Sequence, residues 1–217
     1  MTGFAAARLR SRSELGEASE WVVSAVLLVA LAAIVGARWL AVTRGLDGLL
    51  VGVGFGGALS AVWLRSARRH RHGPPGSPSA IRALMIPTAA GIGFGLGLVL
   101  VTVAGTLLAG VSLPPGLARP SAPFLPWAVV TVVVATGEEG ILRGVLFDRL
   151  RAAGGLVTAV AVTTIVFALV HVPLYGWHVV PLDLAVGLGL AGLRLATRSI
   201  GAPAVAHAVA DLATWWL

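Results

Sequence analysis

The chain has 217 residues, of which 57% are hydrophobic and only 12% are charged. A soluble domain carries about 25% charged residues, so a water-soluble fold of this length could not hide so much apolar surface. Cysteine is absent, which excludes disulfides, thiolate metal sites and a cysteine nucleophile. The net charge of +7 comes from arginines that lie mostly in short loops between apolar runs, a pattern typical of membrane topology and not of nucleic-acid binding.

The apolar runs predict an all-α, multi-pass transmembrane helical bundle of about seven spans. In chain order the expected spans are Trp21–Val42, Leu46–Leu64, Ala83–Val111, Trp127–Leu150, Leu156–Val172, Val179–Leu195 and Gly201–Leu217. A basic linker rich in Pro, Gly and Ser, Arg65–Arg82, follows the second span, and the Pro-rich stretch Ser112–Pro126 follows the third. We therefore divide the chain into a tail, two spans and the linker (1–82), a third span with the Pro-rich loop (83–122) and a helical core (123–217).

Small and aromatic residues mark the expected contacts of these helices. Gly93, Gly95 and Gly97 repeat in the third span, and Gly187 and Gly189 in the sixth. In lipid, small residues allow helix backbones to approach one another closely. At the end of the chain, Trp215 and Trp216 are suited to anchor the last span at the membrane interface.

The arginines predict how the bundle is oriented. With seven spans, 12 arginines fall on one side of the membrane and three on the other, while Arg143 lies within a span. The positive-inside rule then places the N-terminus in the cytoplasm and the C-terminus outside. Every basic residue is Arg and none is Lys, which together with abundant Ala, Gly and Val indicates a GC-rich genome. We therefore expect an integral protein of a bacterial plasma membrane.

The fourth span contains three ionisable residues in the run TGEEGILRG. A charged side chain near the bilayer centre costs about 2.5–3.5 kcal/mol. Glu139 and Arg143 are four residues apart, so they share a helix face and can pair, which is also what a purely structural salt bridge would do. Glu138 lies about 100° around the helix from Glu139 and has no such partner. It must face the bundle interior or a wet cavity.

Two further spans carry histidine. The fifth ends in FALVH, which places Phe167 and His171 on one face, and the seventh holds HAVAD, which does the same for His207 and Asp211. Spans four, five and seven thus each offer an acid or an imidazole. Such a set can activate a water, with Glu138 as general base, or can hold a divalent metal through Glu138, His171 and His207.

Other polar residues are interpreted more simply. His178 and Asp183 lie near the loop before the sixth span, and we expect them at the membrane interface. Depth counting along the helices places Glu138 about 15 Å, His207 about 12 Å and His171 about 24 Å from the cytoplasmic end. The three converge only if the fifth span begins deeper or is kinked or tilted, and Gly154 and Gly155 offer that freedom.

The three motifs EExxxR, FxxxH and HxxxN/D, in this order on separate helices, resemble the CAAX protease and bacteriocin-processing (CPBP, or Abi) family of intramembrane proteases. They occupy Glu138–Arg143, Phe167–His171 and His207–Asp211, and the resemblance covers residues 123–217. It implies a helical endopeptidase that cleaves peptide bonds within or beside the membrane. Its partners would be the lipid bilayer and a membrane-bound peptide or protein, with no nucleic acid.

The resemblance also implies roles for the motif residues. Glu138 and His171 would activate the attacking water, while His207 and Asp211 would stabilise the oxyanion or complete a metal site. Glu139 and Arg143 would support the site, as would Phe167. Asp211 departs from the Asn of the eukaryotic relatives, and an ionised Asp cannot donate a hydrogen bond to an oxyanion. The cofactor expectation is therefore either none or one divalent metal, with zinc favoured.

Two other functions fit the same residues. Intramembrane Glu, His and Asp also suit a proton-coupled transporter, although no inverted repeat or broken helix is evident. A non-catalytic immunity or scaffold protein of the same fold is the second alternative, because intact motifs indicate the capacity for catalysis and not turnover itself.

Overall fold

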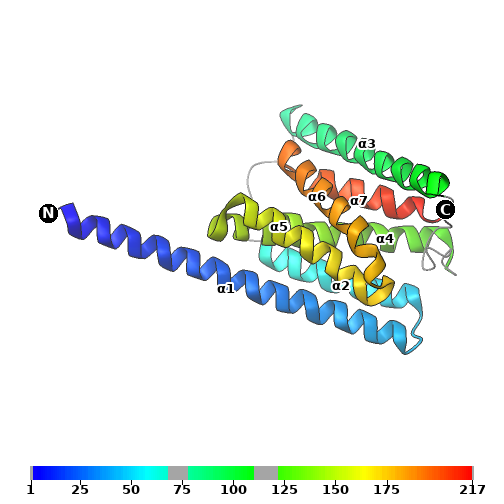
Figure 1. Ribbon diagram of the computed structural model, residues 1–217, viewed down its shortest axis with the longest axis horizontal. Helices are drawn as coiled ribbons and strands as arrows, with labels where there is room; N and C mark the ends of the chain where they lie inside the picture. The colour runs from blue at the N-terminus through cyan, green and yellow to red at the C-terminus, as the bar shows by residue number, and fades with distance from the viewer. Residues whose placement is uncertain (1, 68–77, 110–121, 217) are drawn as a thin grey trace.

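The computed structural model describes residues 2–67, 78–109 and 122–216, and in this part of the chain all regular structure is helical. The helices are α1 (Thr2–Thr43), α2 (Gly48–Ala67), α3 (Pro78–Ala109), α4 (Phe124–Glu139), a π-helix η1 (Gly140–Leu146), α5 (Phe147–Tyr175), a short 3-10 helix η2 (Trp177–Val179), α6 (Val180–Thr197) and α7 (Gly201–Ala213). They pass back and forth along one direction and form a bundle (Figure 1). The predicted all-α class is confirmed. Most of the basic linker and of the Pro-rich stretch lies outside the described residues.

The bundle is built to lie in a membrane. Within the described residues, five helical runs are long and apolar enough to cross a bilayer, namely Gly16–Thr43, Gly48–Ala67, Leu84–Gly105, Phe124–Tyr175 and Trp177–Thr197. Large apolar side chains cover the outer surface, and Val157 is 82% and Leu108 90% exposed. Lipid accepts such a surface and water does not, so the chain is an integral membrane protein.

The expected count of about seven spans is approximate. The predicted fourth and fifth spans correspond to two passes within the 52-residue run Phe124–Tyr175, which are divided by a non-helical residue, Gly155. The predicted seventh span corresponds to α7, which has only 13 residues. The predicted first span is extended, because α1 continues back to Thr2 through residues that we expected to form a tail. Glu20 in this extension forms an ion pair of 2.6 Å with Arg149 at the start of α5.

Gly155 reverses the direction of the 52-residue run. Its backbone has φ 81° and ψ −179°, a conformation open to glycine and strained for any other residue. A straight helix would separate Glu138 from His171 by about 50 Å at 1.5 Å per residue. The chain instead turns back here (Figure 1), and candidate ligand atoms of the two side chains lie within 4.8 Å of one another. Gly155 therefore provides the change of direction that brings His171 close to Glu138.

The turn also removes the mismatch in depth. Glu138 lies 17 residues before Gly155 and His171 lies 16 residues after it, so the two are at the same level. The sequence predicts that the fourth span ends near Leu150. In the structure the helix continues from there to the turn at Gly155, which adds about one helical turn of length. His207 reaches the same level from a nearer turn, because α6 ends at Thr197 and the left-handed residue Arg198 that follows it is only nine residues before His207.

Glycines allow the closest helix contacts. A Cβ added to Gly91 would come within 2.5 Å of the Ala202 carbonyl oxygen, and one added to Gly95 within 2.7 Å of the Ala206 carbonyl oxygen. This Gly-x-x-x-Gly face of α3 therefore lies directly against the α7 backbone. Gly93 and Gly97, which we expected to share this role, have open space around them. Helix α2 packs on α4, where Gly52 and Gly56 lie against valine side chains, so α2 and α3 support the two helices that carry Glu138 and His207.

Candidate functional site

The site is built around an irregular segment of helix. Where α4 would continue, residues Gly140–Leu146 form a π-helix, which is wider than an α-helix and disturbs its ladder of hydrogen bonds. The ring of Trp63 covers Gly140 so closely that a Cβ there would lie 2.4 Å from it. On the other side, the Arg194 Nε of α6 donates a hydrogen bond of 3.0 Å to the Arg143 carbonyl oxygen. These contacts hold the segment immediately after the two glutamates.

Arg143 and Glu139 form the buried base of the site, and both are fully inaccessible. The Arg143 Nη1 donates a hydrogen bond of 2.9 Å to Glu139 Oε1, and its Nη2 donates one of 3.0 Å to the Gly187 carbonyl oxygen. The guanidinium also lies 4.6 Å from the centre of the Phe167 ring. The predicted pair is therefore present, and it links α4 and the π-helix to α5 and α6.

His207 is surrounded by carboxylates on both ring nitrogens. Its Nδ1 lies 3.2 Å from Glu139 Oε1, the same oxygen that accepts the Arg143 bond. Its Nε2 lies 3.8 Å from Glu138 Oε2 and 3.5 Å from Asp211 Oδ2. Carboxylates only accept hydrogen bonds, so this environment is satisfied when both nitrogens donate or when a cation lies on the Nε2 side. Glu139 thereby orients the ring and directs Nε2 toward Glu138.

His171 is oriented in a comparable way from α5. Its Nδ1 lies 2.8 Å from the Phe167 carbonyl oxygen and 3.5 Å from Asp183 Oδ2 of α6. Both of these atoms are acceptors, so a neutral imidazole in this position carries its proton on Nδ1. Its Nε2 then keeps a lone pair. The Phe167 ring packs edge-on against both histidines, with ring centres 4.9 Å from His171 and 5.3 Å from His207.

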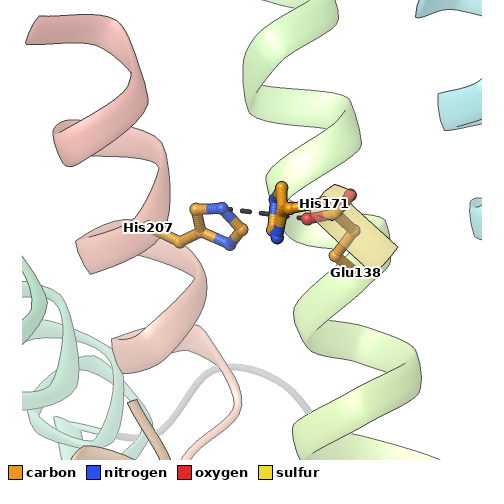
Figure 2. Close-up of side chains that lie close together, drawn as sticks. All are labelled: Glu138, His171 and His207. Carbon is orange, nitrogen blue, oxygen red and sulfur yellow. Dashed lines mark ion pairs between the residues drawn. The ribbon is translucent and has the colours of Figure 1, made fainter. Parts of the chain in front are cut away.

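Glu138, His171 and His207 converge from three helices (Figure 2). Each offers one ligand atom, and these atoms lie within 4.8 Å of one another. Glu138 and His207 are each only 4% exposed, while the His171 side chain is 17% exposed. The arrangement combines a buried carboxylate with two imidazoles and has access from the His171 side.

The structure places the other predicted residues around this centre. The Asp211 side chain lies at the rim and is 41% exposed, in contact with the centre through His207. His178 is exposed on η2, in keeping with an interface position. Asp183, which we also expected at the interface, instead has its side chain 17% exposed and faces His171.

Two residues that position the site were missed in the sequence. Arg194 was counted among the loop arginines, but its side chain is 18% exposed and reaches the π-helix. The Gly187 carbonyl, which accepts from Arg143, has no signal in the sequence, because every residue carries such a carbonyl. The sequence does carry a signal for Arg194, and the same signal for Asp183. Each is a charged residue within or beside an apolar span, and such a charge is costly and usually functional.

Comparison with known proteins supports the resemblance. Residues 120–213 match the family model described as type II CAAX prenyl endopeptidase Rce1-like, which is the CPBP/CAAX protease family. The matched stretch contains all three motifs and begins shortly before α4. No curated protein and no solved structure matches the chain.

Proposed function

We propose that this chain is an intramembrane endopeptidase that hydrolyses peptide bonds of a membrane-associated protein or peptide. The observation that carries the proposal is the convergence of Glu138, His171 and His207 in the centre of an apolar bundle. Bringing three such groups out of water is costly, and that cost is typical of sites that perform chemistry or transport. The family match over residues 120–213 favours hydrolysis of a peptide bond.

Glu138 and His171 are suited to activate a water. In the proposed reaction Glu138 accepts a proton from a water held beside the His171 Nε2, and the hydroxide adds to the carbonyl carbon of the substrate peptide. The proton is then delivered to the leaving nitrogen as the C–N bond breaks. The buried position of Glu138 excludes bulk water, which strengthens the electrostatic interactions that drive this step.

His207 is suited to stabilise the oxyanion that forms on the carbonyl oxygen. Glu139 holds its Nδ1, and Arg143 holds Glu139 from the other side, so the ring cannot turn without breaking buried hydrogen bonds. A donor that is fixed before the reaction needs no reorganisation when charge develops. Asp211, 3.5 Å from the His207 Nε2, would keep a proton on that nitrogen. In this role an Asp acts through the histidine, so it does not need to donate to the oxyanion itself.

The same three residues fit a divalent metal. A carboxylate with two imidazoles is a donor set found in catalytic zinc sites, and zinc would polarise the carbonyl and lower the pKa of a bound water. We propose metal analysis of the purified chain to distinguish the two mechanisms. About one metal ion per chain that disappears in a His207→Ala variant would assign the three residues to a metal centre. Cleavage by a metal-free chain would assign them to water activation.

The first test of the proposal is Glu138→Gln in proteoliposomes. The probe is a fluorescence-quenched peptide that ends in a prenylated Cys-aliphatic-aliphatic-X sequence, with its unprenylated twin and a quenched transmembrane peptide as further probes. Gln keeps the size of the side chain and removes the base, so we expect the cleavage rate to fall by about 100- to 10,000-fold. Full cleavage by Glu138→Gln would refute the assigned role.

A matched control separates loss of chemistry from loss of fold. Glu20 also pairs with an arginine, but at a partly exposed position within α1, and neither partner belongs to the site. A Glu20→Gln variant should therefore cleave at the wild-type rate. Which of the three probes the wild type cleaves identifies the substrate class.

A further inference from the structure

Asp183 is a largely buried acidic residue beside the site that has no role in the proposed reaction. It lies in the first turn of α6, and its Oδ2 is buried. Within the described residues this oxygen accepts no hydrogen bond. It lies 3.5 Å from the His171 Nδ1, with which it can form an ion pair. A buried carboxylate oxygen without other partners is unfavourable unless it serves a neighbouring donor.

The arrangement repeats what is found at the second histidine. His207 presents its Nδ1 to Glu139 of α4, and His171 presents its Nδ1 to Asp183 of α6. In each case a carboxylate from another helix faces Nδ1. The two rings lie beside Glu138 in the shared centre (Figure 2). Carboxylates that orient catalytic or metal-bound imidazoles through the outer nitrogen are a common device.

We propose that Asp183 is a positioning residue that holds the Nδ1 proton of His171 and so keeps the lone pair of Nε2 available in the shared centre. The Phe167 carbonyl also accepts from this nitrogen, at 2.8 Å, but it is neutral and belongs to the same helix as His171. Asp183 adds an acceptor from another helix, and an ionised carboxylate is the stronger acceptor. The effect of Asp183 on cleavage rests on the proposed function, whereas the tautomer of His171 can be observed without any substrate.

The direct test observes the imidazole nitrogens by NMR. The full chain is labelled on histidine nitrogen and studied in nanodiscs at alkaline pH, where an ordinary imidazole is neutral. The His171 signals are identified by their loss in His171→Gln. In the wild type and in Asp183→Asn we expect a protonated Nδ1 and an unprotonated Nε2, because the Asn carbonyl also accepts a hydrogen bond. In Asp183→Leu we expect the Nε2-protonated form to become substantial.

The matched pair separates orientation from a general effect on the helix. Both variants remove the negative charge at the start of α6, so they lose any interaction with the helix dipole equally. Only Asp183→Leu removes the side-chain acceptor, and the Phe167 carbonyl remains in both variants. An Asp183→Leu chain whose His171 spectrum equals that of the wild type would overturn the inference, whatever its activity.

Kinetics provide the second readout. With the cleaved probe we expect kcat to fall about 10- to 100-fold in Asp183→Leu, with KM little changed, and to recover largely in Asp183→Asn. An unchanged kcat in Asp183→Leu would contradict the positioning role. If Glu138→Gln proved fully active, the proposed function would fail, while the spectrum would still decide whether Asp183 sets the tautomer.

Discussion

At the scale of single residues, the most unusual feature is a chain of buried ionic contacts from Arg143 through Glu139 to His207 and Glu138. One oxygen, Glu139 Oε1, accepts from both Arg143 and His207. The Glu139 Oε2 and the Arg143 Nε have no hydrogen-bond partner within the described residues. The cluster is therefore not a fully satisfied salt bridge, and it is costly if its only purpose is stability. Its arrangement is better explained by the need to hold His207.

Breaking this pair should destabilise the protein strongly. In Arg143→Met the Glu139 carboxylate stays buried without its main partner, and we expect a loss of about 3–5 kcal/mol. The double variant Glu139→Gln with Arg143→Met leaves no buried charge in the pair and should recover part of that loss. Thermal unfolding in detergent measures both variants.

A partly exposed pair supplies the control. Arg149 forms a shorter ion pair with Glu20, but the two side chains are 16% and 32% exposed. Arg149→Met leaves its partner Glu20 partly in contact with solvent, so it should cost less than Arg143→Met. Equal losses for Arg149→Met and Arg143→Met would contradict the special cost that we assign to the buried pair.

Sequence spacing located the central residues because helical periodicity is reliable over four residues. Glu139 with Arg143, and His207 with Asp211, were predicted as neighbours for this reason. Contacts between helices were not predictable. Asp183 and His171 are separated by a turn, and Arg194 meets the π-helix across 51 positions in the chain. Neither contact follows from a pattern within one helix.

At the scale of elements, the contact between α3 and α7 controls the position of His207. The Gly95 backbone lies directly against the Ala206 carbonyl, one residue before His207. α3 lies outside the stretch that matches the family model, yet it supports the helix that carries the last motif.

Gly95→Ala should therefore impair both stability and cleavage. The added Cβ would lie 2.7 Å from the Ala206 carbonyl oxygen, which forces the two helices apart. Overpacking of this kind costs about 1–3 kcal/mol, and a displaced His207 should lower kcat. Gly93→Ala is the control, because nothing lies within 4 Å of its added Cβ. The two variants are compared by thermal unfolding and by cleavage rate, and identical behaviour would refute this role of α3.

The glycines of α3 show why the contact face of a helix is not predictable from its sequence. The sequence contains glycines at 91, 93, 95 and 97, and periodicity alone does not reveal which pair meets a neighbour. The structure selects Gly91 and Gly95. The π-helix has no sequence signal of its own either, since it depends on Trp63 and Arg194 from other helices.

At the scale of the whole molecule, the alternating direction of the helices places the arginines at opposite ends of the bundle. Arg44 follows α1 at one end, whereas Arg149, Arg151 and Arg198 lie near the turns at the other end (Figure 1). This is the segregation from which we expect a cytoplasmic N-terminus. The absence of cysteine makes the expectation easy to test, because any introduced thiol is the only one in the chain.

Thr43→Cys and Ala152→Cys place one thiol at each end. Both native residues are exposed, and neither takes part in the site. The assay uses spheroplasts, which are bacterial cells without a cell wall but with a sealed plasma membrane. A membrane-impermeant maleimide should label Thr43→Cys at once, and Ala152→Cys only after the membrane is permeabilised. The physical reason is that the arginine-rich end is retained in the cytoplasm during insertion. The opposite labelling pattern would show that the N-terminus lies outside the cell. It would also reverse the side of the membrane from which a substrate reaches Glu138.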